Sequence, residues 1–161
     1  MRTRFLALRC GAVLAAVAAV LPHSLTAQAP VKSAAAVKWG PGPDFLPRGA
    51  RFVVIQGDPS KSGVYTIRLR LPNGYKIPPH FHPTDEHVTV LSGTFLIGMG
   101  DTVKMKSALT LSAGGFITAP AAAHHWARAR GATVVQVSGE GPFALTYAKD
   151  SDDPRNAKPK P

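Results

Sequence analysis

Cysteine is almost absent from this sequence, since Cys10 is the only one among 161 residues. It lies in the N-terminal segment that we expect to be removed on export. The remaining chain then has no cysteine for a disulfide and no thiolate for a metal. Any metal in the mature protein must therefore be held by nitrogen and oxygen atoms.

Long hydrophobic runs are also scarce. The longest, Gly11–Leu21, has eleven residues, well short of the roughly 20 that a membrane-spanning helix needs. Three arginines precede it and the small-x-small triplet Ala27-Gln28-Ala29 follows it. This layout is typical of a secretory signal peptide. We expect residues 1–29 to be cleaved, the protein to be periplasmic or secreted, and no part of it to insert stably in a membrane. Pro30 leaves the cleavage position open.

Acidic residues are few, with 9 Asp and Glu against 19 Lys and Arg. The formal charge is +10, and it falls to +7 once the three arginines of the signal segment are removed. Such a surplus raises the question of nucleic acid. Export and the scattered placement of the charges argue against that partner. We expect a small-molecule ligand, and the positive charge favours an anionic one. Loose attraction to an anionic envelope surface stays open. A homodimer stays open as well.

Helical periodicity is lacking between Arg51 and Ala148. In VYTIRLRLP, Tyr65, Ile67 and Leu69 alternate with polar residues, as in a strand with one buried face. RFVVIQG precedes this segment, and further short segments follow it, separated mostly by glycine, proline or aspartate: IPPHFH, EHVTVLSG, TFLIGM, DTVKMK, ALTL, FITAP, HHWARA, ATVVQVS and FALTYA. This pattern predicts one all-β domain, a sandwich or small barrel, over residues 51–149. Residues 30–50 form an extended lead-in, and the polar tail 150–161 is expected to be disordered.

Histidine is rare outside two clusters. In the first, HFHPTDEH, His80 and His82 are two residues apart and share a strand face. Glu86 shares a face with Val88 and Val90, and a carboxylate on an apolar face is costly unless it is paired or coordinated. Imidazole and carboxylate together suit a divalent metal such as Mn, Fe, Zn or Ni.

The second cluster is the adjacent pair His124 and His125. Arg128 and Arg130 should face water, so His124 and Trp126 are predicted on the wet side and His125 on the inner side. The predicted metal ligands are therefore His80, His82, Glu86 and His125. By the same alternation, His87 lies opposite Glu86, where it is either an ordinary polar residue or a group near the substrate.

These residues resemble the motifs of the cupins. The first cupin motif, Gly-x5-His-x-His-x3-Glu-x6-Gly, is met at every spacing by Gly74, His80, His82, Glu86 and Gly93. The second, Gly-x5-Pro-x-Gly-x2-His-x3-Asn, is matched at three positions and departs at two: Gly114, Pro120 and His125 match, whereas Ala122 and Ala129 replace glycine and asparagine.

Phrases such as KWGPGPDFLPRGARF and VVQVSGEGPFALTY are similar to those of small exported single-domain cupins, over about residues 37–155. The resemblance implies a cupin-type jelly-roll β-barrel, the double-stranded β-helix of RmlC-like proteins, with the metal inside its mouth. It implies no particular reaction.

Two functions stay open. Three histidines and a carboxylate would leave metal positions for a ligand, unlike a closed structural zinc site, so the chain is either a metal-dependent enzyme, with an oxygenase (dioxygenase) as the example, or a non-catalytic binding or sensor module. Zinc-binding cupin sensors that restrain transcription factors are a weaker comparison for an exported protein. The catalytic residues are unknown. Candidate pocket residues, each also explicable by packing or by a wet strand face, are Tyr65, Phe95, Phe116, Gln136 and Tyr147.

Overall fold

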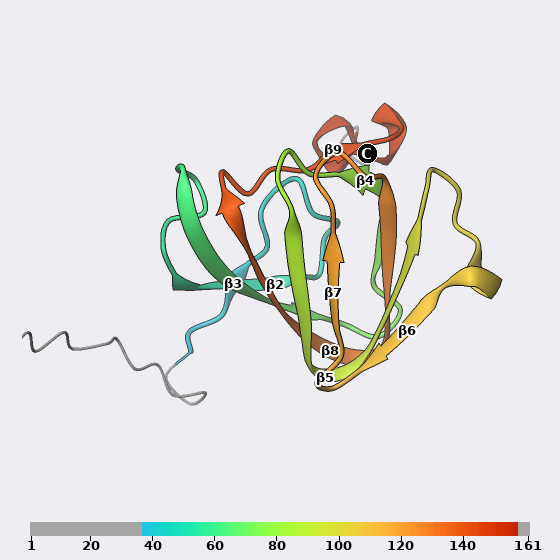
Figure 1. Ribbon diagram of the computed structural model, residues 1–161, viewed down its shortest axis with the longest axis horizontal. Helices are drawn as coiled ribbons and strands as arrows, with labels where there is room; N and C mark the ends of the chain where they lie inside the picture. Colours follow the sequence, from blue (N-terminus) through green and yellow to red (C-terminus); the bar gives the residue numbers. More distant parts are fainter. Residues whose placement is uncertain (1–36, 158–161) are drawn as a thin grey trace, which may run out of the picture. The chain divides into compact units, whose positions relative to one another are not determined.

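Two long antiparallel strands organise the fold, β5 (Glu86–Met99) and β8 (His125–Gly141). They lie side by side through the centre of the computed structural model, which describes residues 37–157 (Figure 1). The predicted signal peptide and residues 158–161 lie outside the described residues.

Both strands turn from one layer of the sheet to the other near their middles. The pairing of β5 with β8 shifts register around Ser92, next to Gly93. Gly93 has a φ of +79°, and a Cβ there would lie 2.4 Å from the carbonyl oxygen of Ala132. Only glycine accepts this backbone and this close approach. The segments predicted as EHVTVLSG and TFLIGM are consequently one bent strand, as are HHWARA and ATVVQVS.

The strands form one curled antiparallel sheet whose two halves enclose the core. One half contains β1 (Gly40–Pro41), β2 (Arg51–Gln56), β3 (Gly63–Leu71), the end of β8, the start of β5 and β7 (Phe116–Ala119). The other contains β9 (Thr146–Tyr147), β4 (Lys76–Phe81), the start of β8, the end of β5 and β6 (Leu109–Ser112). The predicted all-β jelly roll is confirmed.

Alternating residues fill the space between the halves. Tyr65, Ile67 and Leu69 of β3 are buried in one core cluster with Val88 and Val90 of β5. Arg68 and Arg70 point to the other face. Arg68 is half-buried and Arg70 is exposed. The period-two pattern therefore assigned the inner face of these strands correctly, because successive side chains in a strand point to opposite sides.

The ends and loops differ more from the sequence prediction. DTVKMK is an exposed connection that contains the 3-10 helix η2 (Met105–Ser107), and only Thr146–Tyr147 of FALTYA pairs as a strand. The tail, whose composition indicated disorder, forms the 3-10 helices η3 (Asp150–Asp152) and η4 (Pro154–Asn156). Within the described range, no helix is long and apolar enough to span a membrane.

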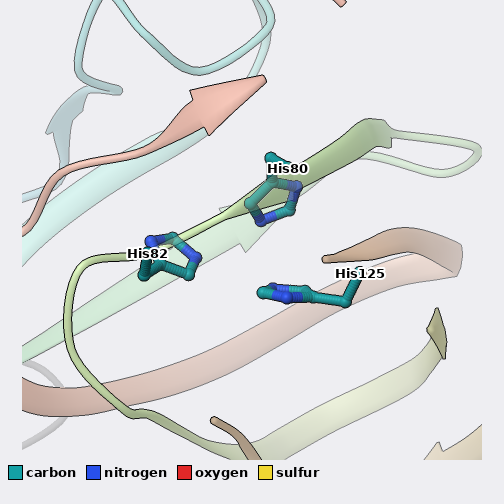
Figure 2. Close-up of side chains that lie close together, drawn as sticks. All are labelled: His80, His82 and His125. Atoms are coloured by element: carbon teal, nitrogen blue, oxygen red, sulfur yellow. The ribbon is translucent and has the colours of Figure 1, made fainter. Parts of the chain in front are cut away.

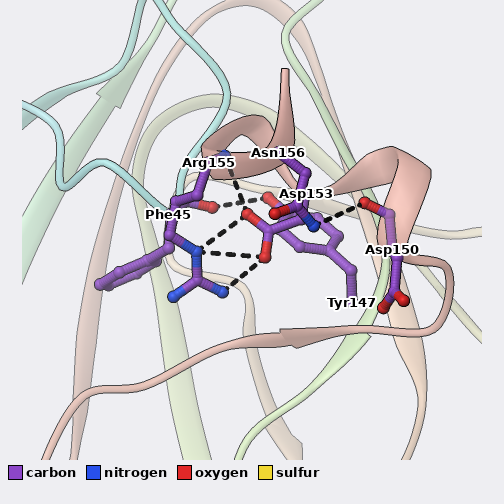
Figure 3. A network of polar contacts seen from close by, with 6 residues as sticks. All are labelled: Phe45, Tyr147, Asp150, Asp153, Arg155 and Asn156. Atoms are coloured by element: carbon purple, nitrogen blue, oxygen red, sulfur yellow. Dashed lines mark hydrogen bonds and ion pairs between the residues drawn. The ribbon is translucent and has the colours of Figure 1, made fainter. Parts of the chain in front are cut away.

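Figure 3 shows the polar contacts within the tail and one contact that joins β9 to the lead-in. The hydroxyl of Tyr147 donates to the carbonyl oxygen of Phe45 at 2.7 Å, which joins the lead-in to β9. Arg155 forms an ion pair with Asp153 at 2.6 Å, and the side chain of Asn156 donates to a backbone carbonyl in η3. Pro154 and Arg155 of the tail border one hollow together with lead-in residues that include Leu46.

Candidate metal centre

Three buried histidines meet between β4 and β8. His80 lies in β4 and pairs directly with His125 at the start of β8, and His82 follows one residue after β4 ends. Each offers a ring nitrogen within 4.8 Å of the others. Figure 2 shows the three rings turned toward a common point. The spacing of two brings His80 and His82 to the same side, and the strand pairing adds His125.

Backbone carbonyls orient all three rings. The Nδ1 of His80 lies 2.7 Å from the Pro78 oxygen, that of His82 lies 2.7 Å from the Ala144 oxygen, and that of His125 lies 3.0 Å from the Ala123 oxygen. A carbonyl oxygen only accepts, so each Nδ1 carries the proton and donates. The lone pair of each neutral ring then lies on Nε2. This is the arrangement that metal-binding histidines use.

The Nε2 atoms of His82 and His125 are buried and have no hydrogen-bond partner among the described residues. A buried polar atom left unpaired costs about 1–3 kcal/mol. A divalent cation would satisfy both atoms at once. The donor set therefore fits a metal.

Glu86 begins β5 and borders this cluster. One carboxylate oxygen lies 3.6 Å from the Nε2 of His82, and the other lies 3.5 Å from the Nε2 of His125. Glu86 is buried, as predicted, but the group of converging ligand atoms consists of the three histidines alone. The structure thus places Glu86 beside the site, and its role as a ligand stays a proposal.

Burial and the neighbouring ionisable groups together set the pKa values of the residues in the metal-free site. Burial, with the neighbouring His125 and His82, lowers the pKa of His80 to about 3. Burial raises the pKa of Glu86, but His82 and His125 outweigh it and lower that pKa to about 2. Burial lowers the pKa of His125, but the Glu86 carboxylate outweighs it, so that pKa is raised. Near neutral pH, Glu86 is an anion and His80 is neutral.

A small cavity adjoins the histidines. Its volume is about 20 Å³, enough for an ion or a water molecule but not for a sizeable organic molecule. Apart from the three histidines and Glu86, its walls are entirely apolar: Leu46, Leu69, Leu71, Ile77, Val88, Phe95, Ile97, Ala127, Val135, Val137, Phe143 and Leu145.

Sequence reasoning missed part of this wall. Leu46 lies in the irregular lead-in and carries no periodic signal. Phe143, Leu145 and Tyr147 are all buried, and their spacing of two in FALTYA was an available signal. Only Phe95 of the predicted pocket residues lines the cavity.

The other pocket candidates lie elsewhere. Tyr65 and Tyr147 belong to the core cluster without reaching the cavity wall. Gln136 lies on the outer face, where its side-chain oxygen accepts from Nε of Arg68 at 3.1 Å. Phe116 is 58% exposed. For Gln136 the alternative of a wet strand face therefore holds. A strand pattern alone does not reveal which polar or aromatic residue lies on the outer face.

The two histidines set aside by alternation are indeed outside the cluster. His124 pairs with Asp101 and stacks on Phe81. His87 lies 3.0 Å from the hydroxyl of Thr118. Neither belongs to the converging group.

The prediction for Trp126 needs correction. It lies outside the core cluster, as alternation indicated, but it is only 1% exposed rather than wet. Its indole packs against Gly98, where an added Cβ would lie 2.3 Å from the ring. Asp101, Val103 and Met105 of the β5–β6 connection border the same outer groove as Trp126. Tertiary packing of that connection, which alternation cannot reveal, therefore excludes water from the indole.

Ala122 stands where the second cupin motif has glycine. Its φ is +58°, and no other non-glycine residue in the described chain has a positive φ. The backbone thus keeps the left-handed conformation in spite of the substitution. The N–H of Ala122 donates to the carbonyl oxygen of His82 at 2.9 Å, which links the two histidine-bearing segments.

Comparison with known proteins agrees with this geometry. Residues 27–144 match the model of the ChrR cupin-like domain family. The chain belongs to this family. No curated protein matches this cupin.

Solved structures share the fold of this cupin. An RmlC-like cupin from Shewanella frigidimarina has 11% identity and a TM-score of 0.53, over 68% of this chain and 87% of its own. KdgF from Halomonas sp. has 16% identity and a TM-score of 0.50, over 71% and 89%. The DMSP lyase DddQ from Ruegeria pomeroyi has 17% identity and a TM-score of 0.55, over 71% and 62%. At these identities the likeness concerns the fold alone.

Proposed function

We propose that this protein is an exported single-domain cupin that binds one divalent metal ion through His80, His82, His125 and Glu86. The observation that carries the proposal is that the Nε2 atoms of His82 and His125 are buried without a hydrogen bond, beside the oriented ring of His80. Mn, Fe, Zn and Ni all suit a donor set of imidazole nitrogen and carboxylate oxygen. Within the described chain the site contains no thiolate that would favour one of these metals.

The chain's own residues prepare the site. The carbonyls of Pro78, Ala144 and Ala123 hold the three rings in the metal-binding tautomer. Glu86 supplies a negative charge that offsets a buried cation. A divalent metal bound there supplies a Lewis acid centre and, where the metal is redox-active, one-electron chemistry.

A small-molecule ligand would take the remaining metal positions. The walls around the histidines and Glu86 are apolar and offer no second polar anchor for a ligand. The ligand is therefore either very small or enters when the wall of Leu46, Phe143 and Leu145 moves. An oxygenase is the enzymatic form of this proposal.

A non-catalytic binding or sensor module is the second candidate. One observation favours it: no ionisable side chain lines the cavity in the described chain apart from the three histidines and Glu86. A separate general acid or base is thus lacking from the cavity wall as described.

Metal analysis of the purified mature protein tests the shared part of the proposal. We expect close to one divalent ion per chain, lost from the variant with alanine at His80, His82 and His125. An unchanged metal content in that variant would refute the site. Oxygen uptake with phenolic or keto acids then supports the enzyme, whereas tight ligand binding without turnover supports the module.

Export is tested separately. Sequencing the N-terminus of periplasmic or secreted protein should find cleavage near Ala29. Retention of Met1 in a cytosolic fraction would contradict it.

A further inference from the structure

The connection between β5 and β6 carries exposed apolar side chains next to lysines. We name residues 100–108 the β5–β6 loop; η2 lies in it, and Figure 1 shows it projecting away from the barrel. Val103 and Met105 are 50% and 42% exposed, and Lys104 and Lys106 are exposed beside them. The β5–β6 loop therefore presents apolar side chains and positive charges side by side, which is the composition of segments that bind at a membrane surface.

More cations surround this loop. Met105 borders one hollow with Lys76, Arg128 and Lys149, and another with Arg128 and Arg130. Lys76 and Arg128 are also paired residues of adjacent strands. Among the described residues none of the six cations forms an ion pair: Lys76, Lys104, Lys106, Arg128, Arg130 and Lys149.

Two carboxylates lie beside the six cations. Asp101 and Asp152 both border the hollow of Lys76, Arg128 and Lys149, and Asp101 also pairs with His124. The surface therefore carries a local positive excess with apolar groups at its most exposed point. We call this surface, made of the β5–β6 loop and the four cations beside it, the basic loop face.

The floor of the basic loop face consists of buried side chains. Trp126 and Leu96 are both buried on the outer side of the sheet, outside the main core cluster. Trp126 borders the hollow shared with Val103 and Met105, and Leu96 borders the one shared with Met105. The loop thus rests on a packed base that displays its apolar side chains outward.

We propose that the basic loop face docks the protein on an anionic phospholipid surface. Val103 and Met105 enter the boundary between headgroups and acyl chains, and the six cations face the phosphates. This docking is independent of the metal site and goes beyond the proposed function.

Charge and composition favour lipid over other partners. Nucleic acid without sequence preference is bound by cations together with aromatic side chains on which bases stack, and the β5–β6 loop contains no aromatic residue. A symmetric second copy would place the same cations against one another. An anionic lipid surface satisfies both the charges and the apolar groups.

The test uses the chain from Pro30 onward, which contains the whole core cluster because all its members lie between Leu46 and Tyr147. Cosedimentation is measured with phosphatidylcholine vesicles, with and without phosphatidylglycerol. We expect binding only to the mixed vesicles and weaker binding at high salt. Circular dichroism checks that each variant keeps its sheet.

Two double variants separate charge from apolar insertion. Lys104→Ser with Lys106→Ser should weaken binding to mixed vesicles by about 30-fold. Val103→Ser with Met105→Ser, at unchanged charge, should weaken it by about fivefold or more. The matched control, Arg48→Ser with Lys61→Ser, removes two exposed cations elsewhere and should change binding less than about twofold.

Three results would overturn the proposal. The first is equal loss of vesicle binding in the control and in the loop variants. The second is absence of binding to the mixed vesicles. The third is a loop variant whose only defect is in self-association or in binding to nucleic acid.

Discussion

Replacing His125 by alanine should abolish stabilisation of this cupin by metal, whereas replacing its neighbour His124 should not. His125 is one of the three converging histidines, and its Nε2 is buried without a hydrogen bond. His124 points to the surface and pairs with Asp101. Adjacent positions in one chain thus give a matched pair of variants with opposite expectations.

The expected size follows from mass action. A ligand that binds only the folded state, at about 100 times its Kd, adds about 2.7 kcal/mol of stability. For a domain of roughly 120 residues, 1 kcal/mol corresponds to about 4 °C in Tm. Mn or Zn at that excess should therefore raise the Tm of the wild type and of His124→Ala by about 10 °C, and that of His125→Ala by about 0–2 °C.

The assay is calorimetry of chelator-treated mature protein at neutral pH, with and without metal. The metal-dependent difference is the quantity to compare, because deleting the imidazole also leaves the carbonyl of Ala123 without its donor and lowers the metal-free Tm. A full rise in His125→Ala with none in His124→Ala would refute the strand register. A full rise in the triple alanine variant at His80, His82 and His125 would place the metal elsewhere.

Three further predictions concern stability and pH. Ala122→Gly should stabilise the fold by about 1 kcal/mol in urea titrations, because glycine accepts a positive φ without strain; a loss of stability would contradict this. Gly98→Ala should destabilise it by about 1–3 kcal/mol, because the new Cβ meets the Trp126 ring; an unchanged urea midpoint would contradict that. Metal affinity, measured by calorimetry, should fall as pH falls through the raised pKa of His125, because a protonated imidazole has no lone pair to offer a metal. An affinity that does not change on acidification would contradict this.

The division of the inner ligands from the outer histidines could be predicted from the sequence. His80 and His82 share a face because a strand alternates with period two, and the same alternation separated His125 from His124 and Glu86 from His87. These are local properties of the chain. They hold in any antiparallel sheet that buries the apolar face, and the structure brings all three predicted histidine ligands together.

Only the tertiary structure shows which segments pack against the inner and outer faces of the sheet. Alternation placed Trp126 on the outer side, but only folding of the β5–β6 loop brought Val103 and Met105 to the groove beside it. Leu46 and Phe143 reach the cavity wall from segments distant in sequence from the histidines. Such contacts depend on the closing of loops and on packing between layers, which a periodic pattern does not encode.

The sequence by itself determined an all-β chain, the three inner histidines that could hold a metal and the side of each strand that faces inward, because these follow from residue type and period-two spacing. The tertiary structure alone decided that two pairs of predicted segments are single bent strands, that the cavity is small and apolar, and that Glu86 lies between His82 and His125. The physical reason is the separation in sequence over which each effect acts. Backbone alternation acts between neighbouring residues, whereas cavity size and charge pairing arise only when strands distant in the sequence pack together.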